Sequence, residues 1–458
     1  MANRYIIHKR DTGYFRRRKT GIRGNAMKNM IALLLAFTMA FGLAACGGSS
    51  EETEPTETSA ETTPTAAPTG TTVVYWSMWD ADDTQGQVIS QAVQSFTAET
   101  GIAVDLQFKG SALQEELPAA LAAGETVDVF DGDLDWVNDT FGSDLMDLEE
   151  QVDKYSYEET AIGGLMDACR DAGKGTLRSV PYQSSMVNFF YNKTIFEEVG
   201  VTVPGDWDDL LEVCEAIKAA GYTPITCDDT YITSMFGYHM GRLTDEDGVC
   251  SIVQKAKWDE SDVEQFAEEY AELASLGYFS AGIGSNVWPA GQNELLQGTA
   301  AMYLSGTQAM IEAEAASGVV LGCFAYPEVD GGETEQEAAY YCADVLAIHS
   351  STQVPNDAFK LVNYLTKGES DRNMAQRTSG IPADTENTAD SALMASIQSV
   401  MDGLTNRWSW AAGAESNDEI TAAIKENTLK LCSGSITAEE FVENMLSAAG
   451  VEEEEEDE

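Results

Sequence analysis

Histidine and positive charge are scarce in this sequence, and both shortages narrow its chemistry. Three histidines occur among 458 residues, and 26 Lys+Arg face 77 Asp+Glu, which gives a formal net charge of −51. His239, His349 and scattered cysteines do not form a zinc-site pattern. Phosphate binding needs clustered cations, so the charge excludes nucleic acids and anionic membrane surfaces as partners. A strongly negative surface keeps a protein soluble, and it also fits an exported protein whose ligand is neutral or cationic.

Motifs for nucleotide, nucleophile and calcium chemistry are also absent. The chain has no GxxxxGK[ST], no GxGxxG and no GxSxG. Asp131–Asp135 resembles the start of a calcium loop, but Trp136 and Gly142 stand where glycine and glutamate are required. With 77 carboxylates, a hydrolase-like pair can always be nominated, so carboxylates alone are no evidence of hydrolysis. We expect no metal, no cofactor and no catalysis.

The cysteines indicate an anchor and no disulfide framework. Seven remain besides Cys46, an odd number without a CxxC pair. Residues 27–46 contain a basic start, an apolar run too short for a membrane span, and small residues before Cys46. This order is typical of a secretory signal peptide. Leu43–Cys46 resembles the bacterial lipobox. We therefore expect residues 1–45 to be removed, with residues 1–26 either an extended basic start or a misassigned one, and Cys46 to carry lipid.

The mature chain is still more acidic, and its ends are not expected to fold. Nine of the 26 Lys+Arg and one of the 77 Asp+Glu precede Cys46, so the mature formal charge is −59. Residues 46–70 are Ser, Thr, Glu, Pro and Ala-rich, typical of a flexible tether, and residues 451–458 form an acidic tail. The body between them is too large for one compact core. We expect lipid on Cys46 to hold it at the extracellular face of the cell membrane.

Apolar periodicity predicts an α/β fold. Strands are expected over 71–76, 102–108 and 127–130, with helices between them, which is the pattern of a parallel sheet covered by helices. Ligands bind beyond the carboxyl ends of such strands, so Trp76–Asp83 and Phe130–Trp136 are the segments of interest.

Further α/β structure is expected after Pro181. Asp206 is positioned to cap a helix that ends at Gly221. Thr437 and Glu440 have the spacing of a capping box before another helix.

Several stretches, taken in order, resemble the extracellular solute-binding proteins of bacterial ABC importers, in particular the sugar-binding class related to maltose-binding protein. Their order and spacing carry the resemblance from about Thr71 to Gly450. Besides the lipobox and tether they are YWSMWDADDTQGQVISQAVQSFTAETGIAVDLQF (75–108), DVFD (128–131), Pro181-Tyr182 leading to FYNK (190–193), Val203-Pro204 through WDDL (207–210), NELLQGTAAMYLSG (293–306) and SGIP (379–382).

The resemblance implies two α/β lobes of the periplasmic-binding-protein type, with the ligand in a cleft between them. The first lobe would hold 71–181 and 340–396, and the second 182–339 and 397–450. Hinge crossings would fall near Pro181, Ala339 and Ile397. The partners implied are a small sugar and the transmembrane permease subunits, and the protein is expected to be a monomer.

Two strand ends combine aromatic and acidic side chains in the way a sugar requires. A sugar has apolar C–H faces that stack on rings, and hydroxyls that hydrogen-bond to polar groups. The candidates are Trp76, Trp79, Asp80 and Asp82 after the first strand, and Asp131, Asp133 and Trp136 after the third. Two alternatives stay open: Trp76 is the last core residue of its strand, and the aspartates at 131 and 133 serve as turn and helix-cap residues.

The resemblance adds further candidates at the crossings and near the C-terminus. Where the family often has a contacting tryptophan, this chain has Thr307 and Gln308, and Trp288 is a substitute platform or a core residue. The remaining candidates are Tyr182 and Gln183 at the first crossing, Asp344 near the second, and Arg407, Trp408 and Trp410 late in the chain.

The function predicted is capture of a mono- or oligosaccharide for an ABC permease. The alternatives are the same scaffold with another solute, such as a glycerophosphodiester or peptide, a surface-anchored glycan hydrolase, or an adhesion module for polymeric glycan.

Overall fold

The structure is a computed structural model that describes residues 70–388 and 391–451. Cys46, the segment expected to be removed, nearly all of the tether and most of the acidic tail lie outside these residues. Among the described helices, none combines the length and apolarity that crossing a bilayer requires.

Strands and helices alternate along the chain. The strands are β1 Thr72–Ser77, β2 Ala103–Phe108, β3 Val129–Asp133, β4 Ser179–Asn192, β5 Thr223–Thr226, β6 Ala300–Gly306, β7 Leu321–Phe324, β8 Ala338–Ile348 and β9 Asn406–Trp408. The helices are α1 Thr84–Thr100, α2 Leu113–Ala122, α3 Leu134–Phe141, α4 Glu149–Lys154, α5 Gly163–Ala172, α6 Lys193–Val199, α7 Trp207–Ala219, α8 Ile232–Lys255, α9 Ser261–Ser275, α10 Ala290–Leu296, α11 Thr307–Ser317, α12 Pro355–Leu365, α13 Gly368–Thr378, α14 Ala392–Asp402, α15 Asp418–Cys432 and α16 Ala438–Ala448.

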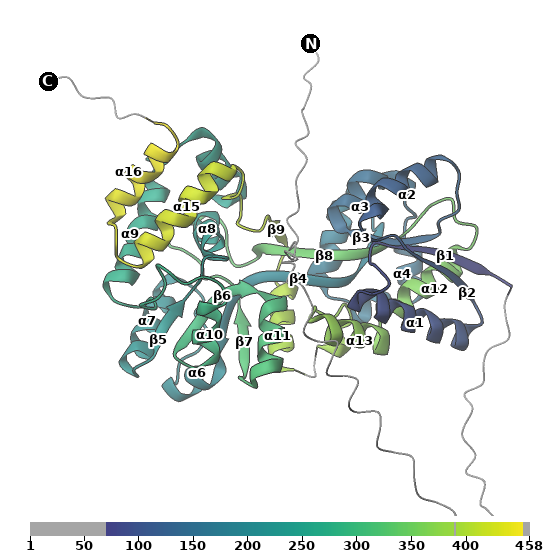
Figure 1. The fold of residues 1–458 in the computed structure, drawn as a ribbon, viewed down its shortest axis with the longest axis horizontal. Coiled ribbons are helices and arrows are strands. Elements are labelled where there is room, and N and C mark those ends of the chain that lie inside the picture. Colours follow the sequence, from purple (N-terminus) through teal and green to yellow (C-terminus); the bar gives the residue numbers. More distant parts are fainter. Residues whose placement is uncertain (1–69, 389–390, 452–458) are drawn as a thin grey trace, which may run out of the picture. The chain divides into compact units, whose positions relative to one another are not determined.

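Two lobes share one continuous path of strands. The order is β2-β1-β3-β8-β4-β6-β5, with β7 on β4 and β9 on β8. The long strands β4 and β8 pair with each other and run from one group of elements to the other (Figure 1). We call β1–β3, α1–α5, α12 and α13 the first lobe, and β5–β7, α6–α11, α15 and α16 the second lobe. The two-lobed α/β fold is confirmed, while the residue boundaries of the lobes stay a prediction.

The first lobe has the predicted parallel arrangement. β1 pairs in parallel with both β2 and β3, as the β-α-β-α-β pattern required. The α1 helix ends at Gly101, whose φ of 72° is left-handed and whose N–H donates to Thr97 O at 3.0 Å. The carboxyl ends of β1 and β3 therefore meet at one edge, beside the start of α1.

The predicted helix caps are present. Asp206 accepts the N–H of Asp209 at the start of α7, at 2.8 Å. Thr437 and Glu440 form a complete capping box on α16. The seven cysteines of the described part are all free, as expected.

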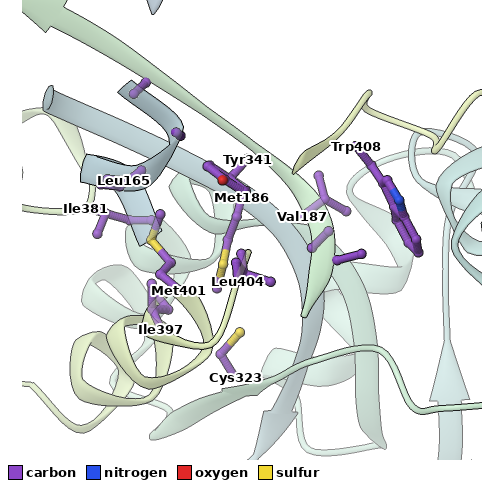
Figure 2. Packing of buried hydrophobic residues seen from close by; sticks show 14 of the residues in the cluster. Leu165, Met186, Val187, Cys323, Tyr341, Ile381, Ile397, Met401, Leu404 and Trp408 are labelled. Atoms are coloured by element: carbon purple, nitrogen blue, oxygen red, sulfur yellow. The ribbon is translucent and has the colours of Figure 1, made fainter. Parts of the chain in front are cut away.

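Buried apolar side chains surround the crossing strands. Met186 and Val187 of β4 and Tyr341 of β8 are buried, with Met401 of α14 and Leu404 beside them (Figure 2). The α14 helix packs against both β7 and α5. The strands that join the lobes are thus held by a core.

Candidate functional site

Trp79 and Tyr182 meet at the edge of the first lobe. Trp79 follows β1 and is half-buried, and its indole Nε1 donates to the Tyr182 hydroxyl on β4 at 2.6 Å. Burial, with the neighbouring Asp131 and Asp344, raises the pKa of Tyr182 well above its ordinary value. The hydrogen bond fixes the plane of the Trp79 ring beside β4, so this predicted residue lies beside the predicted crossing.

An acidic row crosses three neighbouring strands beside this pair. Asp344 of β8 lies directly opposite Asp133 of β3 on one side and Gln183 of β4 on the other. Directly opposed residues project from the same face of a sheet. Burial and the carboxylates of Asp131 and Asp133 raise the pKa of Asp344 well above its usual range. Asp133, Asp344 and Gln183 form what we call the acidic row.

The carboxylate of Asp131 is hydrogen-bonded to other groups of the protein. It is fully buried and accepts hydrogen bonds from Tyr75 Oη at 2.6 Å, Ser77 Oγ at 2.8 Å and Met78 N at 2.5 Å. Burial raises its pKa to about 6. These bonds hold the end of β1, and therefore the loop that carries Trp79, against β3. We treat Asp131 as a residue that positions this loop.

Of the other candidates at the end of β1, Trp76 lies in the core, and Asp80 and Asp82 lie at the surface. Trp76 is 3% exposed, and the Lys109 ammonium lies 3.6 Å from its ring centroid, so the core alternative describes it. Asp80 and Asp82 are exposed on the approach to α1. Both keep the accessibility expected of ligand-binding carboxylates.

Asp133 and Trp136 mark the start of α3. Asp133 Oδ1 accepts the N–H groups of Asp135 and Trp136 at 3.0 and 3.1 Å, so the helix-cap alternative holds for this residue. The residue is nevertheless exposed. Trp136 is half-buried and packs edge-on against Phe141.

The second lobe repeats the combination of aromatic and acidic groups at its own strand ends. β5 and β6 are parallel, so their carboxyl ends lie together. Asp228 and Tyr231 follow β5, and Asp228 Oδ2 accepts from Tyr303 Oη of β6 at 2.9 Å. Burial raises the pKa of Asp228. Tyr231 lies against Gly306, where an added Cβ would be 2.8 Å from the Tyr231 hydroxyl.

Two exposed tryptophans lie against the segment after β5. All eight tryptophans belong to the described part of the chain, and only Trp288 (43%) and Trp410 (39%) are classed as exposed. Trp288 N donates to Asp229 Oδ1 at 3.0 Å, and Trp410 O accepts from Ser234 Oγ at 2.9 Å. Exposed tryptophans gathered at strand ends are typical of ligand sites, because each leaves a large ring face uncovered.

Trp408 does not lie with them. It is 2% exposed, with the Arg242 guanidinium 4.8 Å from its ring centroid and Tyr238 edge-on at 5.4 Å. Figure 2 shows it beside Val187 in the core. Trp408 is therefore a core residue in this structure, with Arg242 over its ring, and its contact with a ligand stays a prediction. Trp410, two residues later, takes the exposed position.

Three polar candidates are bonded to groups far away in the sequence. Arg407 of β9 makes a two-pronged ion pair with Asp135 of α3, with one bond at 3.1 Å. Gln308 Nε2 donates to Thr378 O of α13 at 3.3 Å. Thr307 is buried, and its Oγ1 accepts from Met186 N of β4 at 3.2 Å. These side chains are already engaged by protein groups.

Sequence reasoning missed Asp228 and Tyr231. The signal was present, since the segment TPITCDDTY (223–231) repeats the order used at the first strand, in which an apolar strand is followed by paired aspartates near an aromatic. Gly380 of the SGIP segment also makes room for Gln183 of the acidic row, because an added Cβ there would lie 3.1 Å from Gln183 Cγ. In the described residues no group of three His, Cys, Asp or Glu is arranged to hold a metal.

Comparisons with known proteins bear on the family of the chain. Residues 80–370, more than half of the chain, match the family model of the bacterial extracellular solute-binding protein. A putrescine/cadaverine-binding protein of Pseudomonas aeruginosa is 24% identical over 69% of this chain and 78% of its own length. A multiple sugar-binding protein of Streptococcus mutans is 35% identical, but the match covers 17% of this chain and only 18% of that relative.

A solved structure shows the same fold. The crystal structure of a probable secreted solute-binding lipoprotein of Streptomyces coelicolor superposes with a TM-score of 0.62 at 14% identity, over 82% of this chain and 98% of that one. At this identity the likeness concerns the fold alone. With the family model and the two-lobed architecture in agreement, the chain belongs to the bacterial extracellular solute-binding protein family.

Proposed function

We propose that this protein captures a mono- or oligosaccharide between its lobes and delivers it to an ABC permease. The observation that supports this most directly is the presence of aromatic and acidic groups at the strand ends of both lobes. Trp79 and Asp133 lie on the first lobe, Asp344 and Gln183 on the crossing strands, and Trp288 and Trp410 on the second lobe, where Asp228 is buried behind the surface. Closure of two such walls on one ligand gains contacts from both lobes at once.

The chemistry of these walls suits a sugar. Ring faces of tryptophan stack on apolar C–H surfaces, and carboxylates accept charge-assisted hydrogen bonds from hydroxyls. A phosphodiester ligand would instead need free cations or helix N-terminal amides. Three cations of the described residues near these walls are engaged by protein groups, since Arg407 pairs with Asp135, Lys425 with Asp229 and Lys109 with Glu116. The site therefore favours a sugar over a glycerophosphodiester.

The remaining parts of the proposal come from the sequence. Lipid on Cys46 would anchor the protein at the outer face of the membrane, and residues 46–70 would give it reach. The partners are the permease subunits and the sugar, and the protein acts as a monomer without catalysis. A glycan hydrolase is distinguished by incubation with labelled oligosaccharides, because reducing ends accumulating over time would contradict the binding role.

A thermal-shift screen against a carbohydrate panel tests the proposal. A ligand at 100 times its dissociation constant stabilises the folded state by about 2.7 kcal/mol. Trp79→Ala and Trp288→Ala should each weaken the best sugar about tenfold or more, which corresponds to about 1.4 kcal/mol. The control is Leu276→Ala, which removes another exposed apolar side chain, away from both walls, and should leave affinity unchanged.

Two results would oppose the proposal. Stabilisation by a peptide or phosphodiester and by no sugar would refute the substrate class. An unchanged sugar affinity in both tryptophan variants would mean that the ligand lies elsewhere.

A further inference from the structure

We infer that Tyr238 is a positioning residue of the interlobe hinge: its hydroxyl ties the two crossing strands together where they separate, and it thereby sets the affinity for the ligand without touching it. The residue belongs to α8 in the second lobe, and its side chain is fully buried. The inference rests on the proposed function for its affinity measurement, because a sugar serves as the ligand there.

The crossing strands β4 and β8 change partners at one place, which we call the fork. Met186 of β4 pairs with Tyr341 of β8, and this pair is the last of their shared ladder. The next residue of β4, Val187, pairs with β6 instead, and Tyr340 of β8 pairs with β9. Figure 2 shows Met186 beside Tyr341, and Val187 on the side of Trp408. The fork is thus the point at which the two strands stop holding each other.

One hydroxyl bridges the fork. Tyr238 Oη donates to Val187 O of β4 at 2.7 Å and accepts the N–H of Tyr340 of β8 at 2.8 Å. Burial raises the pKa of Tyr238 above its ordinary value, so the hydroxyl keeps the proton that the first bond needs. Buried main-chain groups cost stability when they have no partner. The hydroxyl therefore takes over at the point where the direct bonds between the strands end.

A second side chain of α8 holds β8 close to the fork. Arg242 lies four residues after Tyr238, and residues four apart share one face of a helix. Its Nη1 donates to Ala338 O of β8 at 2.9 Å, and its Nη2 donates to Tyr326 O at 3.1 Å. The helix therefore fixes β8 at two points, and the hydroxyl of Tyr238 extends this hold to β4.

The fork adjoins the face of β8 that carries part of the acidic row. Tyr340, Cys342 and Asp344 are half-buried, whereas Tyr341 and Ala343 between them are buried. Alternate residues of a strand project to one face, so the fork and the row share a face. A loose fork would let the lobes sample orientations that do not bind. The apparent dissociation constant rises as the binding-competent fraction falls.

Two tyrosine variants test the hold on the strands. Tyr238→Phe removes the bridging hydroxyl and keeps the ring. The control is Tyr270→Phe, because Tyr270 is also buried and its hydroxyl donates to Met235 O at 3.3 Å, which joins α9 to α8 within the second lobe. Hydrogen exchange without ligand, at equal intervals below each melting temperature, reads the ladder amides of residues 341–344. We expect exchange about tenfold faster or more in Tyr238→Phe and unchanged in the control.

Isothermal titration calorimetry tests the effect on binding. The probe is whichever of glucose, galactose, mannose, maltose, cellobiose and chitobiose stabilises the wild type most. Tyr238→Phe should weaken its binding about threefold or more, and Tyr270→Phe should leave the affinity unchanged. A role in stability alone would lower both melting temperatures and alter neither the ladder exchange nor the affinity.

The outcomes separate this inference from the proposed function. Equal ladder exchange in the two variants would overturn the role of Tyr238 in the hinge. Faster exchange with an unchanged affinity would overturn its effect on binding. If no sugar binds the wild type, the proposed function fails, and the exchange comparison, which needs no ligand, still decides whether Tyr238 holds the fork.

Discussion

Asp131 shows how one buried carboxylate shapes the proposed site without touching the ligand. Its hydrogen bonds to Tyr75, Ser77 and Met78 hold the end of β1 against β3. That end carries Trp79 to Tyr182. A charge buried here disfavours its own ionisation, so burial raises the pKa of Asp131 from 3.8 to about 6. The loop that carries Trp79 therefore depends on a residue whose effect on stability changes with pH.

Asp131 should make the stability of the protein fall as pH rises. A carboxyl with a raised pKa in the folded state contributes stability that is complete below its unfolded pKa and is lost through about pH 6. We expect the free energy of unfolding of the wild type, relative to Asp131→Asn, to fall by about 2 kcal/mol between pH 4 and pH 7. Urea unfolding at the two pH values measures this, with Asp139→Asn as the control for loss of one charge. A difference that stays constant or rises with pH would contradict the role of burial.

At the scale of elements, α8 explains the positions of the late tryptophans. Gly237 and Gly241 lie four residues apart on this helix, and added Cβ atoms would meet Ala411 O at 1.8 Å and the Trp408 ring at 2.9 Å. Residues four apart share one helix face. These glycines therefore let the chain after β9 pack directly on α8, which buries Trp408 and leaves Trp410 at the surface.

The capping box of α16 gives an element-scale prediction. Thr437 Oγ1 accepts the Glu440 N–H at 3.1 Å, and Glu440 Oε2 accepts the Thr437 N–H at 2.8 Å. Thr437→Ala should lower the free energy of unfolding by about 1 kcal/mol, because the helix loses its N-cap acceptor. Thr437→Ser keeps the hydroxyl and should lose less than half of that amount in urea unfolding. Equal losses in the two variants would mean that the methyl group, not the cap, carries the effect.

At the scale of the whole molecule, repulsion between the many carboxylates lowers the stability of the folded state. The formal charge of −51 is distributed over a chain with only 26 Lys+Arg to offset it. Several of these cations form pairs on the surface, such as Lys360 with Asp357 and Lys430 with Glu426. Exposed pairs of this kind contribute about 0–1 kcal/mol each, so they do not cancel the overall repulsion.

Salt should therefore stabilise this protein. Screening shortens the reach of repulsion from about 30 Å at 0.01 M to about 8 Å at 0.15 M ionic strength. We expect the free energy of unfolding to rise by about 1 kcal/mol or more between 0.01 and 0.3 M NaCl, with most of the gain below 0.1 M. Sucrose at matched osmolality is the control for effects other than screening. A flat or falling salt dependence would show that attractive pairs dominate the net electrostatic energy.

Local patterns predicted much of the fold and part of the site. The β-α-β-α-β run, the stop at Gly101 and the capping box at Thr437 follow from periodicity and cap residues, which act over a few positions. The strand ends that carry Trp79 and Asp133 followed from the same periodicity. Tyr231 could have been found in this way, because its segment has the same order of residue types.

The burial of particular side chains could not be predicted, because it depends on contacts far apart in the chain. Trp408 is buried by Arg242 of α8, and Asp131 is enclosed by β1. The opposition of Asp133 and Asp344 depends on the register of β3 against β8, which are separated by more than 200 residues. A shift of one residue would turn one of these carboxylates to the other face of the sheet.

The sequence by itself determined the class of the protein: its α/β elements, their caps, its acidity and the order of motifs that resemble the solute-binding family. These features depend on composition and on periodicity over a few positions, which are properties of the sequence and do not require the folded structure. Only the tertiary structure decided which tryptophans are exposed and which carboxylates stand opposite each other. Strand register and packing between distant segments set those properties, because they join residues that the order of the sequence keeps far apart.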